Sequence, residues 1–244
     1  MSTNDLIFEG MISIRAIIES GSRKIHKIYY DNKRAAKHKK ELAWLGHRAD
    51  EAGFEIELCD SEEIEKFSSG STHGGVIAIC GERKINLPTL DDIPDNGFLM
   101  MLEGIEDPFN FGFAVRSAYA AGADAIILPE RNWMDSAGTV CRSSAGASER
   151  IAMFTINDPT LISLFKQKGY RIICADMPDS KGLWESDLKK PLLLIIGGEK
   201  RGISRAILDQ ADSRVRIDYG RDFPESLSAA SASAILAFEV MRQN

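Results

Sequence analysis

Apolar residues in the first part of the chain alternate between helical spacing and the short runs typical of strands. Helical spacing occurs over residues 11–19, 36–52 and 61–67, and strand patterns occur over residues 24–30, 54–58 and 74–80. The last of these strands, GGVIAIC, is apolar enough to be buried. The alternation predicts a small α/β domain over residues 1–82.

The pattern is interrupted after this domain. Residues 81–97, GERKINLPTLDDIPDNG, contain two prolines and several Asp and Asn residues, without sustained periodicity. Such a composition is typical of a connection between domains. We expect an interdomain linker over residues 83–96.

Strand and helix patterns alternate again over residues 97–244, which predicts a second α/β domain. Strands are expected at 98–104, 123–129, 170–177, 191–199 and 214–217, and helices at 111–122, 160–168, 204–211 and 226–242. Strands that alternate with helices indicate a parallel sheet with both faces covered. In such sheets ligands bind beyond the carboxyl ends of the strands, so we expect a site in the loops that follow them.

The composition is typical of a folded protein without a membrane span. The chain has 244 residues, of which 44% are hydrophobic and 27% charged, enough for a buried core. Its longest apolar runs, such as Pro191–Ile196, are too short to cross a bilayer, and the N-terminus lacks signal-peptide features. Four separate cysteines without a CxxC pair predict buried thiols. We expect a cytoplasmic protein with no membrane partner and no metal.

Charge is distributed unevenly, although the formal net charge is −6. Residues 23–48 carry nine Lys or Arg and two acids, whereas residues 49–65 carry eight acids and no base. The basic segment suits an RNA backbone, with Tyr29, Tyr30 and Trp44 as candidates for base stacking. A solvated helix face has the same composition, so charge alone leaves both interpretations open.

Several common types of site are missing from the second half of the sequence. The last histidine is His73, so no Ser-His-Asp, Cys-His or HExxH site can be built from residues 97–244 alone. Neither GxGxxG nor GxxxxGK[ST] occurs, so a dinucleotide site and a P-loop have no support. Arg, Glu, Ser, Asn and Gly are instead concentrated at strand ends, in residues 102–118, 195–204 and 223–243.

These three segments resemble the motifs of the SpoU/TrmH family of SPOUT methyltransferases. They match, in order, Asn-x-Gly-x-x-x-Arg (Asn110, Gly112, Arg116), Gly-x-Glu-x-x-Gly (Gly197, Glu199, Gly202) and a Ser-Leu pair before the last helix (Ser226, Leu227), followed by Ser228. The stretch RSSAGASER over residues 142–150 also resembles the family. EGMISIRAIIESG and THGGVIAI resemble the N-terminal substrate-binding domain of its ribose methyltransferases.

The resemblance implies an S-adenosyl-L-methionine-dependent RNA methyltransferase that modifies a ribose 2′-hydroxyl of rRNA or tRNA. It also implies a C-terminal trefoil knot and a homodimer whose site lies near the subunit interface. The cofactor brings an already activated methyl group, so positioning can supply much of the catalysis. That chemistry needs neither histidine nor a metal.

The resemblance also assigns roles to single residues. Arg116 is expected at the reacting centre, where its guanidinium, a poor base, would bind phosphate and stabilise the developing alkoxide. Glu199 would orient Arg116 or another site group, and Ser226 would hydrogen-bond in the site. Asn110 and Ser228 complete the expected catalytic set. The cofactor would be held, largely through backbone contacts, by Gly197, Gly202, Ile217 and Leu227.

Some of these positions leave alternatives open. Ser226 also suits the N-cap of the last helix, and Ile217 and Leu227 would serve equally well as core residues. Family members usually carry Asn at the position of Ser228, and an amide reaches further than a hydroxyl. The alternative to an active enzyme is therefore a non-catalytic or altered-specificity RNA-binding member of the same fold. The N-terminal domain favours ribosomal over transfer RNA.

Overall fold

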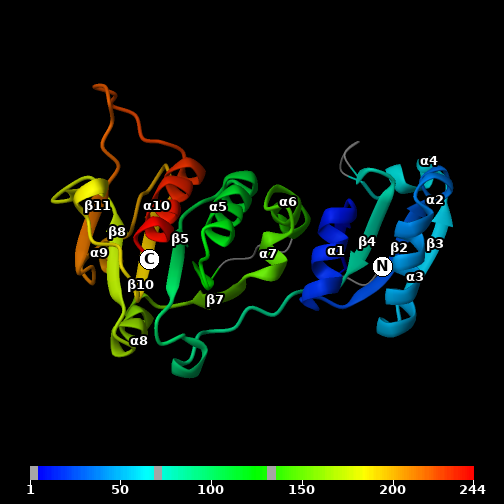
Figure 1. Ribbon diagram of the computed structural model, residues 1–244, viewed down its shortest axis with the longest axis horizontal. Helices are drawn as coiled ribbons and strands as arrows, with labels where there is room; N and C mark the ends of the chain where they lie inside the picture. The colour runs from blue at the N-terminus through cyan, green and yellow to red at the C-terminus, as the bar shows by residue number, and fades with distance from the viewer. Residues whose placement is uncertain (1–4, 69–72, 131–135) are drawn as a thin grey trace. The chain divides into compact units, whose positions relative to one another are not determined.

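The computed structural model describes residues 5–68, 73–130 and 136–244, which form two compact units (Figure 1). Unit 1 comprises Met1–Lys84 and Asn132–Arg150, and unit 2 comprises Ile85–Arg131 and Ile151–Asn244. This division differs from the predicted domains 1–82 and 97–244 in one large respect. Residues 136–150 pack with the N-terminal elements rather than with the sequence that surrounds them.

Unit 1 contains a four-stranded sheet in the order β1-β4-β2-β3. Its strands are β1 (Leu6–Glu9), β2 (Ile25–Asp31), β3 (Glu55–Cys59) and β4 (Val76–Cys80). β4 runs antiparallel to β1 and β2, whereas β2 and β3 are parallel. Apolar side chains of the sheet, α1 (Met11–Ser20) and α3 (Lys39–Ala52) form its core. Tyr30 is fully buried in this core, so the expectation that it stacks on RNA bases is wrong.

The single helix predicted over residues 36–52 is two helices, α2 (Asn32–Lys37) and α3. The Asp31 carboxylate accepts hydrogen bonds from the backbone N–H groups of Lys33 (2.6 Å) and Arg34 (3.1 Å), which starts α2 early. His38, with φ −116° and ψ 50°, leaves the helical region and separates the two helices. The short helix α4 (Ser61–Glu65) follows β3, within the predicted helical stretch.

The helices α6 (Ala137–Ser143) and α7 (Ala147–Arg150) also belong to unit 1. α6 packs against β1 and α1, α7 packs against α1, and Cys141 lies in the same buried cluster as the strands. Gly138 touches the carbonyl of Ile7, and Gly146, at φ 81°, approaches Ala16 so closely that a Cβ would not fit. Small residues thus allow this segment to dock on elements that are distant in the sequence.

Unit 2 contains a seven-stranded sheet in the order β7-β6-β5-β10-β8-β11-β9, in which every neighbouring pair is parallel. The strands are β5 (Phe98–Glu103), β6 (Ala125–Pro129), β7 (Ala152–Ile156), β8 (Arg171–Ala175), β9 (Lys181–Gly182), β10 (Leu192–Gly197) and β11 (Ser213–Arg216). β5 and β10 are buried along nearly their whole length because both faces of the sheet are covered. The predicted parallel-sheet α/β fold is confirmed.

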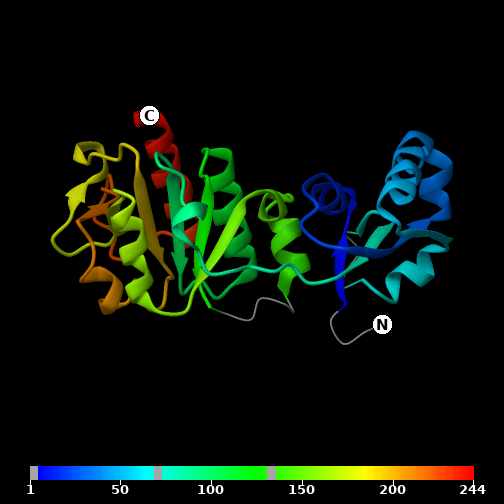
Figure 2. The ribbon, with the colours of Figure 1, turned by 90° about the horizontal axis from the view of Figure 1, so that it is seen from below.

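Helices cover the two faces of this sheet in pairs. They are α5 (Pro108–Ala120), α8 (Ile162–Gln167), α9 (Arg205–Leu208) and α10 (Ala229–Gln243). α5 and α10 lie side by side on one face, and α8 and α9 lie on the other (Figure 1 and Figure 2). No helix of the described residues is long and apolar enough to cross a bilayer. The trefoil knot stays a prediction.

The stretch predicted as a linker, residues 83–96, packs against unit 2 over much of its length. Ile93 is buried in the unit 2 core. The carbonyl of Asn86 accepts a hydrogen bond from the Thr155 N–H (2.9 Å), and Thr89 and Asp92 form a capping box around a short 3₁₀ helix. The prolines and acids of this stretch therefore mark an irregular segment that is attached to unit 2.

Candidate active site

The candidate site begins where the central strands β5 and β10 end. These strands pair with Gly197 opposite Glu103, so the loops that follow them start side by side. Gly198 N–H donates to the carbonyl of Glu103 (2.7 Å), and Gly202 N–H donates to the carbonyl of Gly198 (2.8 Å). A Cβ on Gly197 would overlap the backbone of Gly202, and one on Gly198 would overlap the carbonyl of Gly104. Backbone packing therefore requires glycine at the start of this motif.

A cavity of about 260 Å³ lies at the carboxyl ends of β8, β10 and β11 and reaches the first turns of α10. This is where open parallel sheets place their ligands. Six residues expected in the site line the cavity: Gly197, Glu199, Gly202, Ile217, Ser226 and Leu227. The structure thus brings together both the second and the third motif.

The wall of this cavity fits S-adenosylmethionine, a nucleoside with an attached amino acid chain. Apolar side chains such as Ile196, Ile217 and Leu227 form much of the wall, and a flat heterocycle would pack between them. Gly197, Gly198 and Gly202 add main-chain atoms to the wall, because they carry no side chain. Asp176 adds a carboxylate that can accept hydrogen bonds from a ligand.

Part of the wall was missed by sequence reasoning. Asp176 and Met177 follow β8, and Tyr219 follows β11. The Tyr219 hydroxyl accepts a hydrogen bond from Leu227 N–H (3.0 Å), which ties the loop after β11 to the third motif. Asp176 and Met177 could have been found from the end of the strand predicted at residues 170–177. No local pattern marks Tyr219.

Glu199 connects the first motif with the start of α10. Its Oε1 accepts hydrogen bonds from the Asn110 amide (3.2 Å) and from the Ala229 N–H (3.2 Å). Asp107 in turn accepts from the Asn110 N–H (2.9 Å) and caps α5. Of the two roles expected for Glu199, the geometry supports orientation of another site group, Asn110, rather than of Arg116.

A smaller cavity of about 100 Å³ is also lined by Glu199, Asn110 and Ala229. Glu106 and Lys200 contribute to its wall and form an ion pair of 3.2 Å. The two cavities therefore share Glu199, with the apolar pocket on one side and polar groups on the other. In residues 5–68, 73–130 and 136–244, no group of three or more His, Cys, Asp or Glu side chains is arranged to hold a metal ion.

Arg116 lies apart from these residues. It is exposed on α5 and lines neither cavity, and its side chain forms no hydrogen bond or ion pair within the described part of the chain. It follows Phe109 and Phe113 at spacings of seven and three residues, so the three side chains share one stripe of the helix. Within a single chain, Arg116 is therefore free to bind a group that arrives from outside.

The last helix starts later than predicted, after the third motif. The last helix begins at Ala229, not at Ser226, and its N-cap is Ser228. The Ser228 hydroxyl accepts from the Ser231 N–H (3.1 Å) and bonds to the Ser231 hydroxyl (3.0 Å). The N-cap alternative for Ser226 is therefore wrong, and Ser228, where the family usually has Asn, does the capping.

Comparison with known proteins identifies both parts of the chain. Residues 97–238 match the SpoU rRNA methylase family, and residues 7–85 match a domain described as RNA 2′-O ribose methyltransferase substrate binding. The chain is 28% identical over 247 residues to the 23S rRNA (guanosine-2′-O-)-methyltransferase RlmB of Ralstonia nicotianae, covering 100% of this chain and 97% of that protein. It is 26% identical over 239 residues to RlmB of Escherichia coli, with coverages of 96% and 97%.

Solved structures share the whole fold. An AdoMet-bound rRNA methyltransferase from Sinorhizobium meliloti superposes with a TM-score of 0.82 at 24% identity, covering 98% of this chain and 88% of that one. The SpoU methyltransferase AviRb from Streptomyces viridochromogenes, in complex with AdoMet, gives a TM-score of 0.79 at 21% identity, with coverages of 98% and 90%. These neighbours confirm the fold class.

The family match covers more than half of the chain and confirms the predicted family and enzyme class. The N-terminal match confirms the predicted substrate-binding domain. The glycine-built cavity at the strand ends is thus the candidate site of a methylase. The chain belongs to the SpoU rRNA methylase family, with an RNA 2′-O ribose methyltransferase substrate-binding domain ahead of its methylase domain.

Proposed function

We propose that this protein transfers a methyl group from S-adenosyl-L-methionine to a ribose 2′-hydroxyl of 23S rRNA. The cavity at the ends of β8, β10 and β11 carries the proposal, because its wall unites six residues of the expected site. The relatives named for guanosine 2′-O-methylation of 23S rRNA support the substrate class, and the AdoMet-bound neighbours support the cofactor. A ribosomal substrate implies a cytoplasmic enzyme.

The residues of the chain have to position the reactants. S-adenosylmethionine supplies, when bound, a methyl group activated on a sulfonium. Gly197, Gly202, Ile217 and Leu227 would hold it in the larger cavity. Glu199 joins the start of α5 to the start of α10, and this keeps the boundary between the two cavities in shape. A fixed boundary favours in-line attack by a hydroxyl that enters from the smaller cavity.

Exposed apolar side chains on α5 and α10 support a homodimer. Phe109 and Phe113 on α5 are each 46% exposed, and Phe238 and Met241 on α10 are 44% and 49% exposed. Aromatic and Met side chains gathered on two adjacent helices are typical of a subunit interface. We infer that a second copy covers this surface. Arg116 shares the stripe of the two phenylalanines, so it would lie at the subunit boundary and there bind phosphate and stabilise the developing alkoxide.

The basic segment of unit 1 supports RNA capture. Three of its arginines already pair with acids: Arg23 with Glu149, Arg34 with Glu41, and Arg48 with Glu51. Its exposed lysines on α2 and at the start of α3 form no ion pair within the described residues: Lys33, Lys37, Lys39 and Lys40. These lysines, rather than the arginines, are the groups available to RNA phosphates.

Calorimetric titration with S-adenosylmethionine, followed by transfer of a radiolabelled methyl group to 23S rRNA transcribed in vitro, tests the proposal. We expect cofactor binding and a label that resides in an alkali-resistant dinucleotide, because a 2′-O-methyl group blocks cleavage at that position. Cofactor binding without transfer to any RNA would favour the non-catalytic alternative. Label recovered in a base rather than a ribose would contradict the proposed acceptor.

A further inference from the structure

The segment that contains α6 and α7 is assigned to one part of the protein by its sequence and to the other part by its packing. By sequence it lies inside the methylase match of residues 97–238, but by packing it is part of unit 1. The chain therefore passes between the units three times rather than once. A unit attached at three points of the chain has less freedom than one attached by a single linker. The contacts that hold α6 and α7 on unit 1 therefore control how freely this unit can move.

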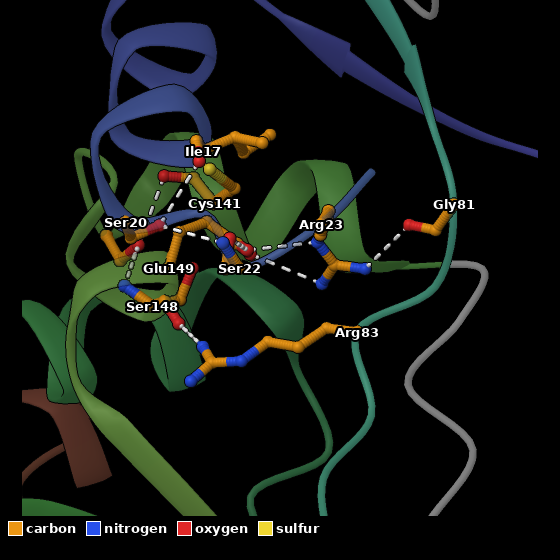
Figure 3. A network of polar contacts seen from close by, with 10 residues as sticks. Ile17, Ser20, Ser22, Arg23, Gly81, Arg83, Cys141, Ser148 and Glu149 are labelled. Atoms are coloured by element: carbon orange, nitrogen blue, oxygen red, sulfur yellow. Dashed lines mark hydrogen bonds and ion pairs between the residues drawn. The ribbon is translucent and has the colours of Figure 1, made fainter. Parts of the chain in front are cut away.

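Glu149 on α7 attaches the segment through a buried, bidentate ion pair (Figure 3). Its carboxylate accepts from Arg23 Nε (3.0 Å), Arg23 Nη2 (3.2 Å) and the Ser22 hydroxyl (2.7 Å). The side chains of Arg23 and Glu149 are only 8% and 2% exposed. A second pair, Arg142 with Glu9 at 2.6 Å, attaches α6. A buried charge depends on its partner, so the Arg23–Glu149 pair opposes detachment of the segment.

Other contacts keep Arg23 and α7 in place around this pair. The Arg23 guanidinium lies over the ring of Phe8, 4.7 Å from its centroid, and donates to the carbonyl of Gly81 (3.4 Å). Arg83 donates to the carbonyl of Ser148, next to Glu149 (Figure 3). The network thus ties α7 to β1 and to the chain that leaves β4. Glu149 lines neither cavity of unit 2.

We infer that Glu149 is a positioning residue for methyl transfer, which locks α6 and α7 onto the RNA-binding unit and so restricts the movement of captured RNA with respect to the methyl-transfer site. The inference rests on the proposed function. Restricted movement raises the effective concentration of the target ribose at the site. It therefore lowers KM for RNA, while the chemical step and the binding of cofactor do not depend on it.

Cys141 reports on this lock without an activity assay. Its thiol is fully buried where α6 meets the unit 1 core, and burial raises its pKa to about 12. In Glu149→Gln the neutral amide no longer compensates Arg23, so the segment opens more often. We expect alkylation of Cys141 by iodoacetamide to accelerate at least about tenfold. Cys174 in the unit 2 core, where burial also raises the thiol pKa to about 12, should stay protected.

Steady-state kinetics on a 23S rRNA transcript test the positioning role. We expect Glu149→Gln to raise KM for RNA about tenfold, with kcat and the cofactor Kd within about twofold of the wild type. Arg142→Gln should act in the same direction, because it removes the arginine partner of Glu9 and loosens α6 while the Arg23–Glu149 pair remains. Asp209→Asn is the control for net charge, because it removes a carboxylate from the exposed Arg205–Asp209 pair, outside the basic segment and both cavities, and should change neither KM nor Cys141 labelling.

Several results would overturn the inference. Unchanged Cys141 labelling in Glu149→Gln would show that there is no lock, and faster labelling with an unchanged KM would show a lock without a positioning role. A parallel fall in kcat and cofactor affinity would indicate general unfolding. Wild-type protein that binds cofactor but methylates no RNA would refute the proposed function instead, and Cys141 labelling would still show whether Glu149 holds the segment.

Discussion

The cavity of unit 2 and the Glu149 network of unit 1 are built by different means. Around the cavity the close contacts are between main-chain atoms, as where Gly198 meets Gly104. In unit 1 a buried carboxylate and a guanidinium join segments that are distant in the sequence. Backbone contacts give a ligand pocket its shape, whereas a buried ion pair holds only while both partners are present. A site for an already activated donor needs shape, and the attachment of a segment distant in the sequence needs a specific partner.

Removal of one partner of the buried pair is expected to have the largest effect. Glu149→Gln leaves the buried Arg23 guanidinium without a carboxylate, so the free energy that holds α6 and α7 on unit 1 should fall by about 3–5 kcal/mol. Hydrogen exchange of the α6 and α7 amides measures it. Arg150, like Glu149 on α7, forms a partly exposed pair with Glu19 of α1, and Arg150→Gln should cost less than about 1 kcal/mol. Equal losses would mean that burial is not what makes the network strong.

Arg116→Ala tests whether the charge of Arg116 is needed for methyl transfer but not for cofactor binding in the pocket. We expect turnover to fall about 100- to 1000-fold, as when one group that stabilises a developing oxyanion is removed. The cofactor Kd should stay unchanged, because Arg116 lines neither cavity. Arg205→Ala, which removes an exposed arginine of unit 2, is the control for net charge. Turnover near that of the wild type in Arg116→Ala would end its catalytic assignment.

Gly198→Ala tests the main-chain construction of the pocket directly. The added Cβ would overlap the Gly104 carbonyl, so β10 and the loop after β5 must separate. We expect cofactor binding to weaken by about 1–3 kcal/mol, measured by calorimetry. Gly46→Ala, inside α3 with no atom within 4 Å of the new Cβ, should instead stabilise the protein by about 0.5–1 kcal/mol in thermal melts. A tight-binding Gly198→Ala protein would contradict the backbone argument.

The smallest effect is expected at Ser228. Ser228→Ala removes the N-cap of α10 and should lower the free energy of unfolding by about 1 kcal/mol. Ser228→Asn restores the residue usual in the family and keeps a capping side chain, so its stability should match the wild type. The turnover of Ser228→Asn, compared with the wild type, then shows how much activity the chain loses by having Ser in place of Asn at this position. If both variants were equally destabilised, capping would not be the role of Ser228.

The cavity residues that directly follow strand ends could be predicted from the sequence. The second and third motifs follow strand ends, and parallel strands bring their ends together, so Gly197, Ile217 and Leu227 meet in one cavity. Arg116 was predicted beside them, but α5 turns it outward, away from both cavities. A motif gives the spacing of residues along a helix, whereas the neighbours on that helix face decide whether a side chain meets the pocket or the solvent.

Helix boundaries show the same limit at shorter range. The last helix was predicted from Ser226, but the capping hydrogen bond is made by Ser228. Both residues are good N-caps, so composition could not choose between them. The backbone conformation decides, because Ser228 is extended (ψ 148°) and its hydroxyl accepts from the Ser231 N–H, so the helix begins at Ala229.

The amino-acid sequence by itself determined the alternation of strands and helices, the parallel sheet of unit 2 and the motifs of the methylase family. These features depend on local periodicity and on residues close to strand ends. Only the tertiary structure decided that α6 and α7 join unit 1 and that Glu149 meets Arg23, a partner 126 positions away. Such pairing depends on how whole elements pack, because the close approach that brings the two buried charges together needs small residues at Gly138 and Gly146.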